Sequence, residues 1–141
     1  MRTQVTFRLT SDHGGSAADV STRLGVSPTS GYEAGGPVGS RTSSPREHSS
    51  WHLSSDRDPQ DGLELATALN VVLDALEPVG PALWQLIRDG YSANWFCYVG
   101  SHATEHAVEL DRETLKRLVQ LPGDLWLDVY PDDDDTDERS A

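Results

Sequence analysis

The chain has 141 residues, of which 36% are hydrophobic, a single cysteine and a formal net charge of −12. This length suits one domain with a modest core, and no apolar run is long enough to span a bilayer. One cysteine excludes an internal disulfide and fits a reducing compartment, so we expect a cytoplasmic protein that does not enter the membrane.

The charge is distributed unevenly along the chain. Residues 1–50 carry a net +1, residues 51–131 a net −8 and residues 132–141 a net −5. A basic surface of the kind that binds phosphate backbones is therefore missing, which argues against direct binding of nucleic acid. An acidic protein can instead meet a basic protein partner, and long-range attraction speeds such an encounter. Solubility alone is the other explanation of the same charge.

The first part of the chain predicts a strand, a helix and a long loop. Apolar and polar residues alternate over residues 4–10, which predicts a half-buried strand rather than a signal peptide. Ser16 and Asp19 have the spacing of a capping box, and the short helix that they open ends at Gly25. Residues 27–50 are dominated by Ser, Gly, Pro and Thr, so we expect a long, mobile loop.

The middle of the chain predicts a short strand, two helices and a central strand. The short strand covers residues 49–56. Asp61, with Glu64 three residues later, is predicted to cap an amphipathic helix. A shorter helix then ends at Gly90, and the aromatic residues 91–99 form a strand that we expect at the centre of the sheet.

The stretch from residue 107 to 131 predicts a strand, a capped helix and a strand. Val108 and Leu110 alternate at the strand period, Asp111 is the helix N-cap, and Gly123 is the stop signal after the helix. The predicted inner face of the helix consists of Leu115, Leu118 and Val119. In the last strand two sets face opposite ways: Leu125, Leu127 and Val129 on one side, and Trp126, Asp128 and Tyr130 on the other.

The resulting order is strand, helix, strand, two helices, two strands, helix and strand. We therefore expect a single α+β domain over residues 1–131, with a mainly antiparallel sheet of about five strands and helices on one face. A ferredoxin-like or related split arrangement fits this order. The acidic tail, residues 132–141, repels itself and should be disordered.

The order and spacing of several short motifs carry a family resemblance. These motifs are Leu24-Gly25-Val26 before Pro28-Thr29, Ser50-Trp51 with Leu53-Ser54, and Asp128-Val129-Tyr130 at the end of the last strand. With them, residues 4–131 resemble a family of small bacterial proteins known as domain of unknown function 4279. The resemblance implies a single-domain bacterial protein of this architecture and transfers no catalytic residue. The Gly/Ser/Pro-rich loop and the poly-Asp tail depart from the family pattern.

Candidate metal and catalytic residues each have a simpler explanation. His102 and His106 have a spacing that suits zinc ligands, but they fall in a predicted turn without a third ligand. The aspartates within residues 56–61 resemble a calcium loop only in part, because its later ligand positions are not met. Cys97 lies among aromatic residues, where a buried, inert thiol is the usual outcome. We expect no metal, no cofactor and no catalytic residue, which favours a non-enzymatic role.

The leading hypothesis is a non-catalytic protein-binding module, and one form of it is an inhibitor or immunity-type protein. If helices cover one sheet face, Trp126, Asp128 and Tyr130 lie on the open one, where aromatic residues beside an acid are typical interface anchors. Asp56 and Asp58, together with the tail, would steer a basic partner. The competing interpretation places Trp126 beneath the long loop or the second pair of helices.

The alternative hypothesis is a small-molecule sensor or minor enzyme with a pocket between the sheet and the long loop. Trp51 would lie near this pocket, and its polar groups would be His48, His52, Arg41 and Arg46. A loop that serves solubility alone also accounts for the two arginines. Self-association is a third possibility, and the sequence leaves the partner, the ligand and the oligomeric state undetermined.

Overall fold

A computed structural model of the chain describes residues 1–11, 14–35, 48–101 and 107–131. The elements are β1 (Arg2–Ser11), α1 (Ala17–Leu24), β2 (Ser30–Tyr32), β3 (Ser49–Ser54), β4 (Gln60–Asp61), α2 (Leu65–Leu76), the 3-10 helix η1 (Glu77–Val79), α3 (Gly80–Arg88), β5 (Tyr91–Ser101), α4 (Arg112–Val119) and β6 (Asp124–Pro131). Residues 36–47 of the predicted loop and the acidic tail lie outside the described residues.

The six strands form one mixed sheet in the order β2-β3-β1-β5-β6, and β4 pairs with β1. β1 is antiparallel to β3 on one side and to β5 on the other. β5 and β6 are parallel, and α4 connects them. The predicted α+β class and mainly antiparallel pairing are confirmed, but the sheet has six strands instead of about five, and the parallel pair β5–β6 makes it mixed. Because β5 and β6 are direct neighbours, their crossover is not of the split kind.

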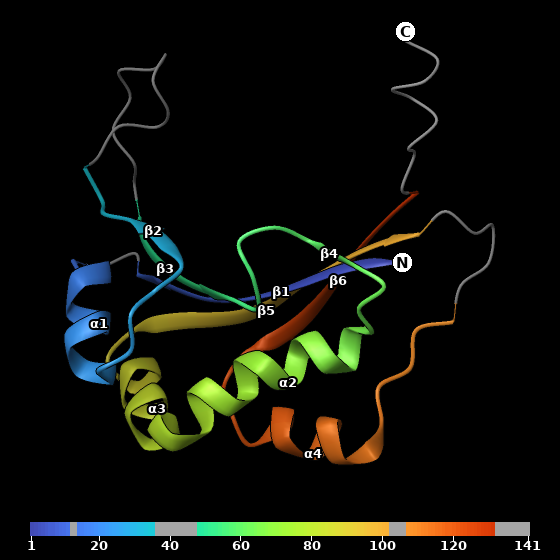
Figure 1. Cartoon of the computed structure of the whole chain (residues 1–141). Coiled ribbons are helices and arrows are strands. Elements are labelled where there is room, and N and C mark those ends of the chain that lie inside the picture. The colour runs from blue at the N-terminus through green and yellow to red at the C-terminus, as the bar shows by residue number, and fades with distance from the viewer. Residues whose placement is uncertain (12–13, 36–47, 102–106, 132–141) are drawn as a thin grey trace, which may run out of the picture.

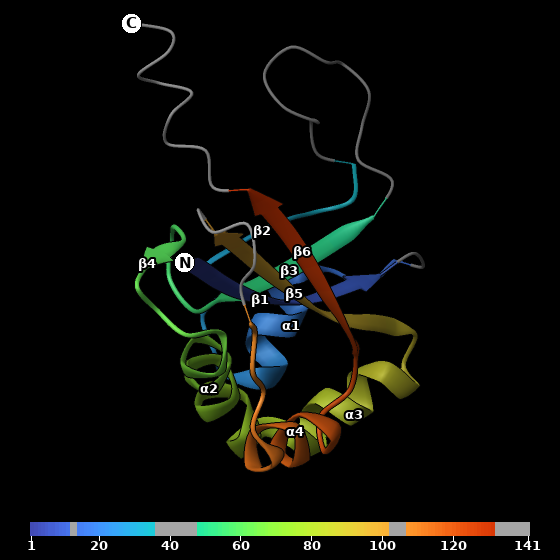
Figure 2. The same ribbon diagram turned by 90° about the vertical axis from the view of Figure 1, so that its right-hand side faces the viewer.

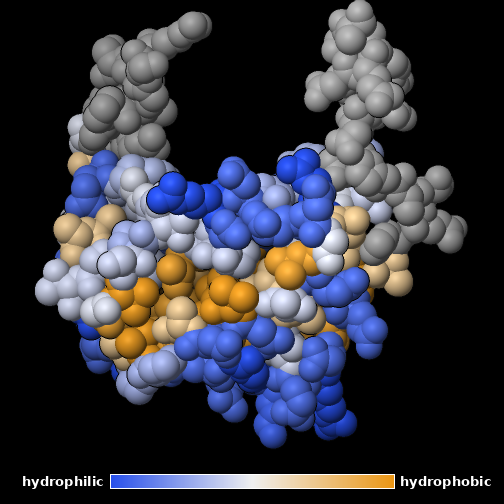
Figure 3. All heavy atoms as spheres, viewed as in Figure 1, coloured by the Kyte–Doolittle hydropathy of each residue, from blue (hydrophilic) through white to orange (hydrophobic). Residues whose placement is uncertain are grey.

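The helices gather on one face of the sheet, as predicted (Figures 1 and 2). Val5, Phe7 and Leu9 of β1 point toward them and are at most 1% exposed. An apolar band marks the level where strands and helices meet, with hydrophilic side chains above and below it (Figure 3). No described helix or strand covers the opposite face. In Figure 1, β2 and β3 rise on the left and β5 and β6 rise on the right, so the uncovered face is concave in this view.

The predicted strand over residues 107–110 is wrong. This segment is irregular, and Val108 and Leu110 pack against the core as partly buried side chains. The reason lies in β5, which extends to Ser101 and is paired with β1 on one side and β6 on the other. Neither edge of β5 is left for a hairpin partner.

Two other local predictions fail in the first half of the chain. Asp61 does not cap a helix, because it belongs to β4 and forms an ion pair with Arg2 at 3.4 Å. α2 begins after Glu64, whose side chain makes no capping hydrogen bond. The segment predicted as a loop over residues 27–50 contains β2, which pairs with β3.

α4 packs against α2 with a face that only partly matches the predicted one, because Leu118 is buried and Leu115 and Val119 are not. Asp111 is the N-cap, as predicted, and accepts a hydrogen bond from the Thr114 amide at 3.3 Å. Thr114 and Leu118 are buried, whereas Leu115 and Val119 are 41% and 74% exposed. Arg117 joins the two helices by donating hydrogen bonds to three side chains of the α2–η1 segment: Asn70, Asp74 and Glu77.

Gly123 is not the stop signal of α4, which already ends at Val119. Its φ of 115° is one that residues with a side chain rarely adopt. A Cβ atom at this position would also approach the Ala93 backbone of β5 to 3.2 Å. Glycine is therefore needed where the chain enters β6 and passes close to its neighbouring strand.

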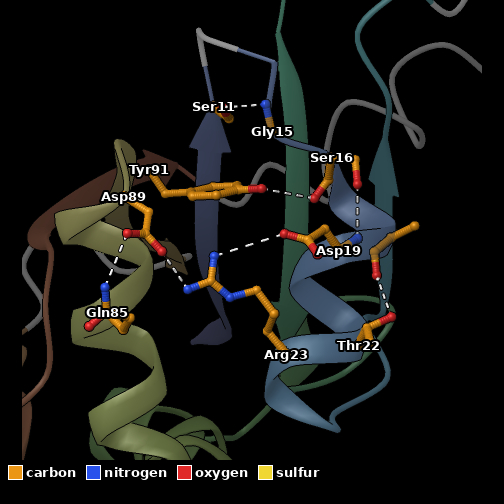
Figure 4. A network of polar contacts seen from close by, with 10 residues as sticks. Ser11, Gly15, Ser16, Asp19, Thr22, Arg23, Gln85, Asp89 and Tyr91 are labelled. Carbon is orange, nitrogen blue, oxygen red and sulfur yellow. Dashed lines mark hydrogen bonds and ion pairs between the residues drawn. The ribbon is translucent and has the colours of Figure 1, made fainter.

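A polar network holds α1 beside the corner between α3 and β5 (Figure 4). Ser16 caps α1, as predicted, by accepting a hydrogen bond from the Asp19 amide at 2.9 Å. Arg23 near the end of α1 forms an ion pair with Asp89 at 2.6 Å. The Tyr91 hydroxyl donates to the Ser16 carbonyl at 3.2 Å. These contacts link segments far apart in the sequence.

We expect the ionised Asp89 side chain to stabilise the fold at neutral pH and to lose this effect in strong acid. Hydrogen bonds from Arg23 and Gln85 lower the pKa of Asp89 in the folded state. An unfolded aspartate has a pKa of about 3.9, so the stabilisation is fully present above that pH and is lost as the pH falls through the lower folded pKa. Urea unfolding at several pH values should show that Asp89→Asn is less stable than wild type at neutral pH, with the difference shrinking toward zero in acid.

Asp58→Asn, in an exposed turn, is the control and should change stability little at any of these pH values. A difference between wild type and Asp89→Asn that did not vary with pH would contradict this assignment.

Candidate functional site

The helix-free face of the sheet carries alternate residues of neighbouring strands, and we call it the concave face. In β1 every second residue is buried against the helix layer, so the residues between them point to the concave face. Strand register extends the assignment across the sheet. Its central members are Gln4, Thr6 and Arg8 of β1, His52 and Ser54 of β3, Asn94, Phe96 and Tyr98 of β5, and Trp126, Asp128 and Tyr130 of β6.

Two pairs of stacked aromatic rings follow β5 and β6 across the concave face, and we call them the aromatic row. The Phe96 and Trp126 rings are 6.2 Å apart between centroids, and those of Tyr98 and Tyr130 are 5.5 Å apart; each pair is inclined by 26°. Trp126 is 59% exposed and Tyr130 46% exposed. Stacking orders the rings while leaving their outer surfaces accessible to a partner.

The three residues predicted as partner anchors lie together on the concave face. The Tyr130 hydroxyl donates a hydrogen bond to Asp128 Oδ2 at 3.0 Å. This bond to a carboxylate raises the pKa of Tyr130. Trp126 is not buried by the described part of the chain, in contrast to the interpretation that placed it beneath a loop or helices.

The predicted steering residues border this face on its other side. Asp56 and Asp58 are exposed in the turn that follows β3. Gln4 on the concave face holds this turn by donating to the carbonyls of Asp56 at 2.7 Å and Arg57 at 3.1 Å. Acidic side chains therefore lie on two opposite sides of the concave face.

Arg8 lies at the centre of the concave face and is missed by sequence reasoning. Its Nε donates to Asn94 Oδ1 at 3.0 Å, and its Cζ is 4.3 Å from the centre of the Phe96 ring. The alternation over residues 4–10 already predicts the face on which Arg8 lies. It contains no information about which side chains of β5 lie beside it.

His52 of β3 is the register partner of Arg8, and its ring contacts two serines. Its Nε2 is 2.7 Å from Ser50 Oγ, and its Nδ1 is 3.2 Å from Ser30 Oγ. A hydroxyl beside an imidazole is the pair that nucleophilic enzymes use. Here Ser50 is only 2% exposed, so its oxygen is poorly placed to attack a substrate.

Of the residues predicted to form a ligand pocket, Trp51 and His52 lie on opposite faces of the sheet. Trp51 is fully buried on the helix side, where its Nε1 donates to Ser21 Oγ at 3.0 Å. His52 points to the concave face, and His48 is exposed before β3. Arg41 and Arg46 lie outside the described residues.

A pocket does exist near the predicted place, between α1 and residues 28–33. Its volume is about 420 Å³, and its walls include Ala18 and Ser21 of α1, with Tyr32 and Glu33 opposite. Glu33 accepts a hydrogen bond from the Ala17 amide and so connects the two walls. Trp51 does not line this pocket, but its Nε1 donates a hydrogen bond to Ser21, which does.

Within the described ranges, no group of three or more His, Cys, Asp or Glu side chains could hold a metal ion. His102 and His106 lie outside these ranges. No helix among the described residues is both long and apolar enough to cross a membrane.

Comparison with known proteins gives one match. The model of the family described as domain of unknown function (DUF4279) matches residues 1–132. No curated protein and no solved structure is similar to the chain.

We expect the thiol of Cys97 to be unreactive in the folded protein. Cys97 is fully buried on the helix side of β5, and burial raises its pKa to about 12. Ellman's reagent at mildly alkaline pH should therefore label it only after unfolding in urea, because the thiolate is the reacting form. Rapid stoichiometric labelling of the folded chain would show that the thiol is accessible.

Proposed function

Since the chain belongs to the DUF4279 family, a domain of unknown function, its activity has to be inferred from its own surface, and we propose a non-catalytic protein-binding module. Its binding site is the concave face. The observation that carries the proposal is the aromatic row, which is ordered by stacking and exposed at Trp126 and Tyr130. Exposed tryptophan and tyrosine beside polar groups are the residue types that most often dominate binding energy at protein interfaces.

The charge supports a partner that is basic around its contact surface. Asp56 and Asp58 on one side of the concave face, and Asp124 and Asp128 on the other, are available to cationic side chains. The net charge of −12 would accelerate the encounter with such a partner. We therefore favour a small acidic inhibitor or immunity-type protein of the bacterial cytoplasm. It would act by covering the surface of a basic protein.

Removing the two exposed anchors should abolish binding to the partner. The test is affinity capture from a lysate of the host organism, followed by purification of the captured protein and calorimetry. We expect a one-to-one complex whose affinity falls by roughly a hundredfold or more in the Trp126→Ala, Tyr130→Ala double variant, because two anchors are lost. Stopped-flow association should slow as salt rises, since salt screens the attraction.

The matched control is the Val71→Ala, Val119→Ala double variant. It removes exposed apolar side chains from the helix layer, where the two valines are 49% and 74% exposed, and it should bind like wild type. Equal loss of affinity in both double variants would argue against the concave face. An association rate that did not depend on salt would contradict a steering role for the acidic residues.

The pocket between α1 and residues 28–33 favours a second candidate function, a small-molecule sensor or minor enzyme. A cavity of about 420 Å³ lies within the size range of ligand sites. A ligand there would contact Ser21 and so would lie one side chain away from Trp51. This arrangement could link ligand binding to the packing of α1 on the sheet.

A thermal-shift screen with metabolites and metal ions tests this second function. A ligand at hundredfold excess over its dissociation constant should raise the melting temperature by roughly 5–10 °C. Ala18→Phe, which fills the pocket from α1, should abolish the shift, whereas Thr67→Phe on the exposed side of α2 should preserve it. A screen without any stabilising compound would argue against the sensor.

A further inference from the structure

Arg8 occupies the centre of the concave face, in the middle of the central strand β1. Its register partners are His52 of β3 and Asn94 of β5, and Asn94 is in turn paired with Asp124 of β6. The side chain is half-buried. Because it arises from a strand hydrogen-bonded on both sides, its backbone position is fixed by the sheet.

Two contacts hold the Arg8 guanidinium in place and leave its outer edge available. Asn94 accepts from Nε at 3.0 Å, and the Phe96 ring lies 4.3 Å beneath Cζ. Both use parts of the group other than the two terminal nitrogens. These terminal nitrogens are the donors with which arginine binds a carboxylate in a two-point, planar geometry.

No carboxylate of the described residues forms an ion pair with Arg8. Three of the other described arginines are matched with acids: Arg2 with Asp61, Arg23 with Asp89, and Arg117 with both Asp74 and Glu77. Arg57, Arg88 and Arg112 are not matched with a described acid, but they lie outside the concave face. The chain has 23 acidic residues, so acids are plentiful. An ordered guanidinium without a described counter-charge, in the middle of an exposed face, has the properties of a receptor for an external anion.

The surroundings of Arg8 select the kind of anion. The aromatic row lies on one side of it and can pack against an apolar group that neighbours the anion. Asp124, two strands from Arg8, repels a doubly charged phosphate about twice as strongly as a singly charged carboxylate. The guanidinium fork binds both groups in a two-point geometry, so the negative surroundings are what favour the carboxylate.

We propose that Arg8 is the recognition site for an aspartate or glutamate side chain at the centre of the partner's contact surface. The inference rests on the proposed function and adds a charge pattern to it. The partner carries a carboxylate in the middle, opposite Arg8, and basic groups around it, opposite Asp56, Asp58, Asp124 and Asp128. Asn94 and Phe96 are positioning residues, because they orient the guanidinium toward the incoming carboxylate.

The site can be tested on the full-length chain with benzoate, a carboxylate attached to an aromatic ring. The side-chain Nε–Hε resonance of Arg8 is followed by NMR at constant ionic strength, with neutral benzamide and inorganic phosphate as comparison ligands. We expect a saturable shift with benzoate at a dissociation constant of roughly 1–10 mM. Benzamide and phosphate should bind at least tenfold more weakly.

Three variants identify the group responsible. Arg8→Gln should lose benzoate binding, which is monitored in this variant through the indole resonance of Trp126. Arg8→Lys should weaken benzoate binding by roughly fivefold or more, because the two-point geometry is lost. Arg57→Gln removes the same charge from the exposed turn and should bind like wild type. Equal shifts with benzamide, or unchanged benzoate affinity in Arg8→Gln, would overturn the site. Tighter binding of phosphate than of benzoate would overturn the choice of a carboxylate.

The captured partner separates this inference from the proposed function. Loss of partner affinity in Arg8→Gln, with recovery in part by Arg8→Lys, would support a carboxylate at the interface. Normal affinity in Arg8→Gln, together with loss in the Trp126→Ala, Tyr130→Ala variant, would overturn the inference and leave the binding module standing. Normal affinity in the aromatic double variant would overturn the binding module itself.

Discussion

The pairing of β1 with β3 and β5 constrains the rest of the molecule. Side chains of β1 alternate between two environments, with Phe7 and Leu9 in the core and Arg8 between them on the concave face. A shift of one residue in the register would move Arg8 into the core and Phe7 into solvent. Both moves are unfavourable, because one buries a charge and the other exposes an aromatic ring. The hydrophobic core therefore fixes the position of Arg8 as firmly as that of Phe7.

The crossover from β5 through α4 to β6 builds the aromatic row. Because the two strands are parallel and adjacent, Phe96 lies beside Trp126, and Tyr98 and Tyr130 stack one step farther along. Arg117 fastens α4 to α2 on the far side of the sheet. The helix layer thus sets the start of β6 and, through the strand register, the spacing of the rings on the opposite face.

Charge acts over two distances on this protein. The acidic groups around the concave face act through the solvent over about 8–10 Å at physiological salt, and their attraction is shared by any basic protein. The Arg8 guanidinium acts only in contact, where it distinguishes one arrangement of partner side chains from another. In the proposed function the first effect governs how fast a partner arrives. The second governs which partner stays, a division of roles that is common at protein interfaces.

Local periodicity in the sequence was enough to predict β1, the caps at Ser16 and Asp111, and the two faces of β6, because alternation and capping involve residues close together in the chain. It also placed Trp126, Asp128 and Tyr130 on one face. The tertiary structure alone decided that residues 107–110 are not a strand and that Arg8 meets Asn94, which is 86 positions away. Strand partners are non-local, and their choice depends on which edges remain free once the core has formed. No pattern within a single segment contains that information.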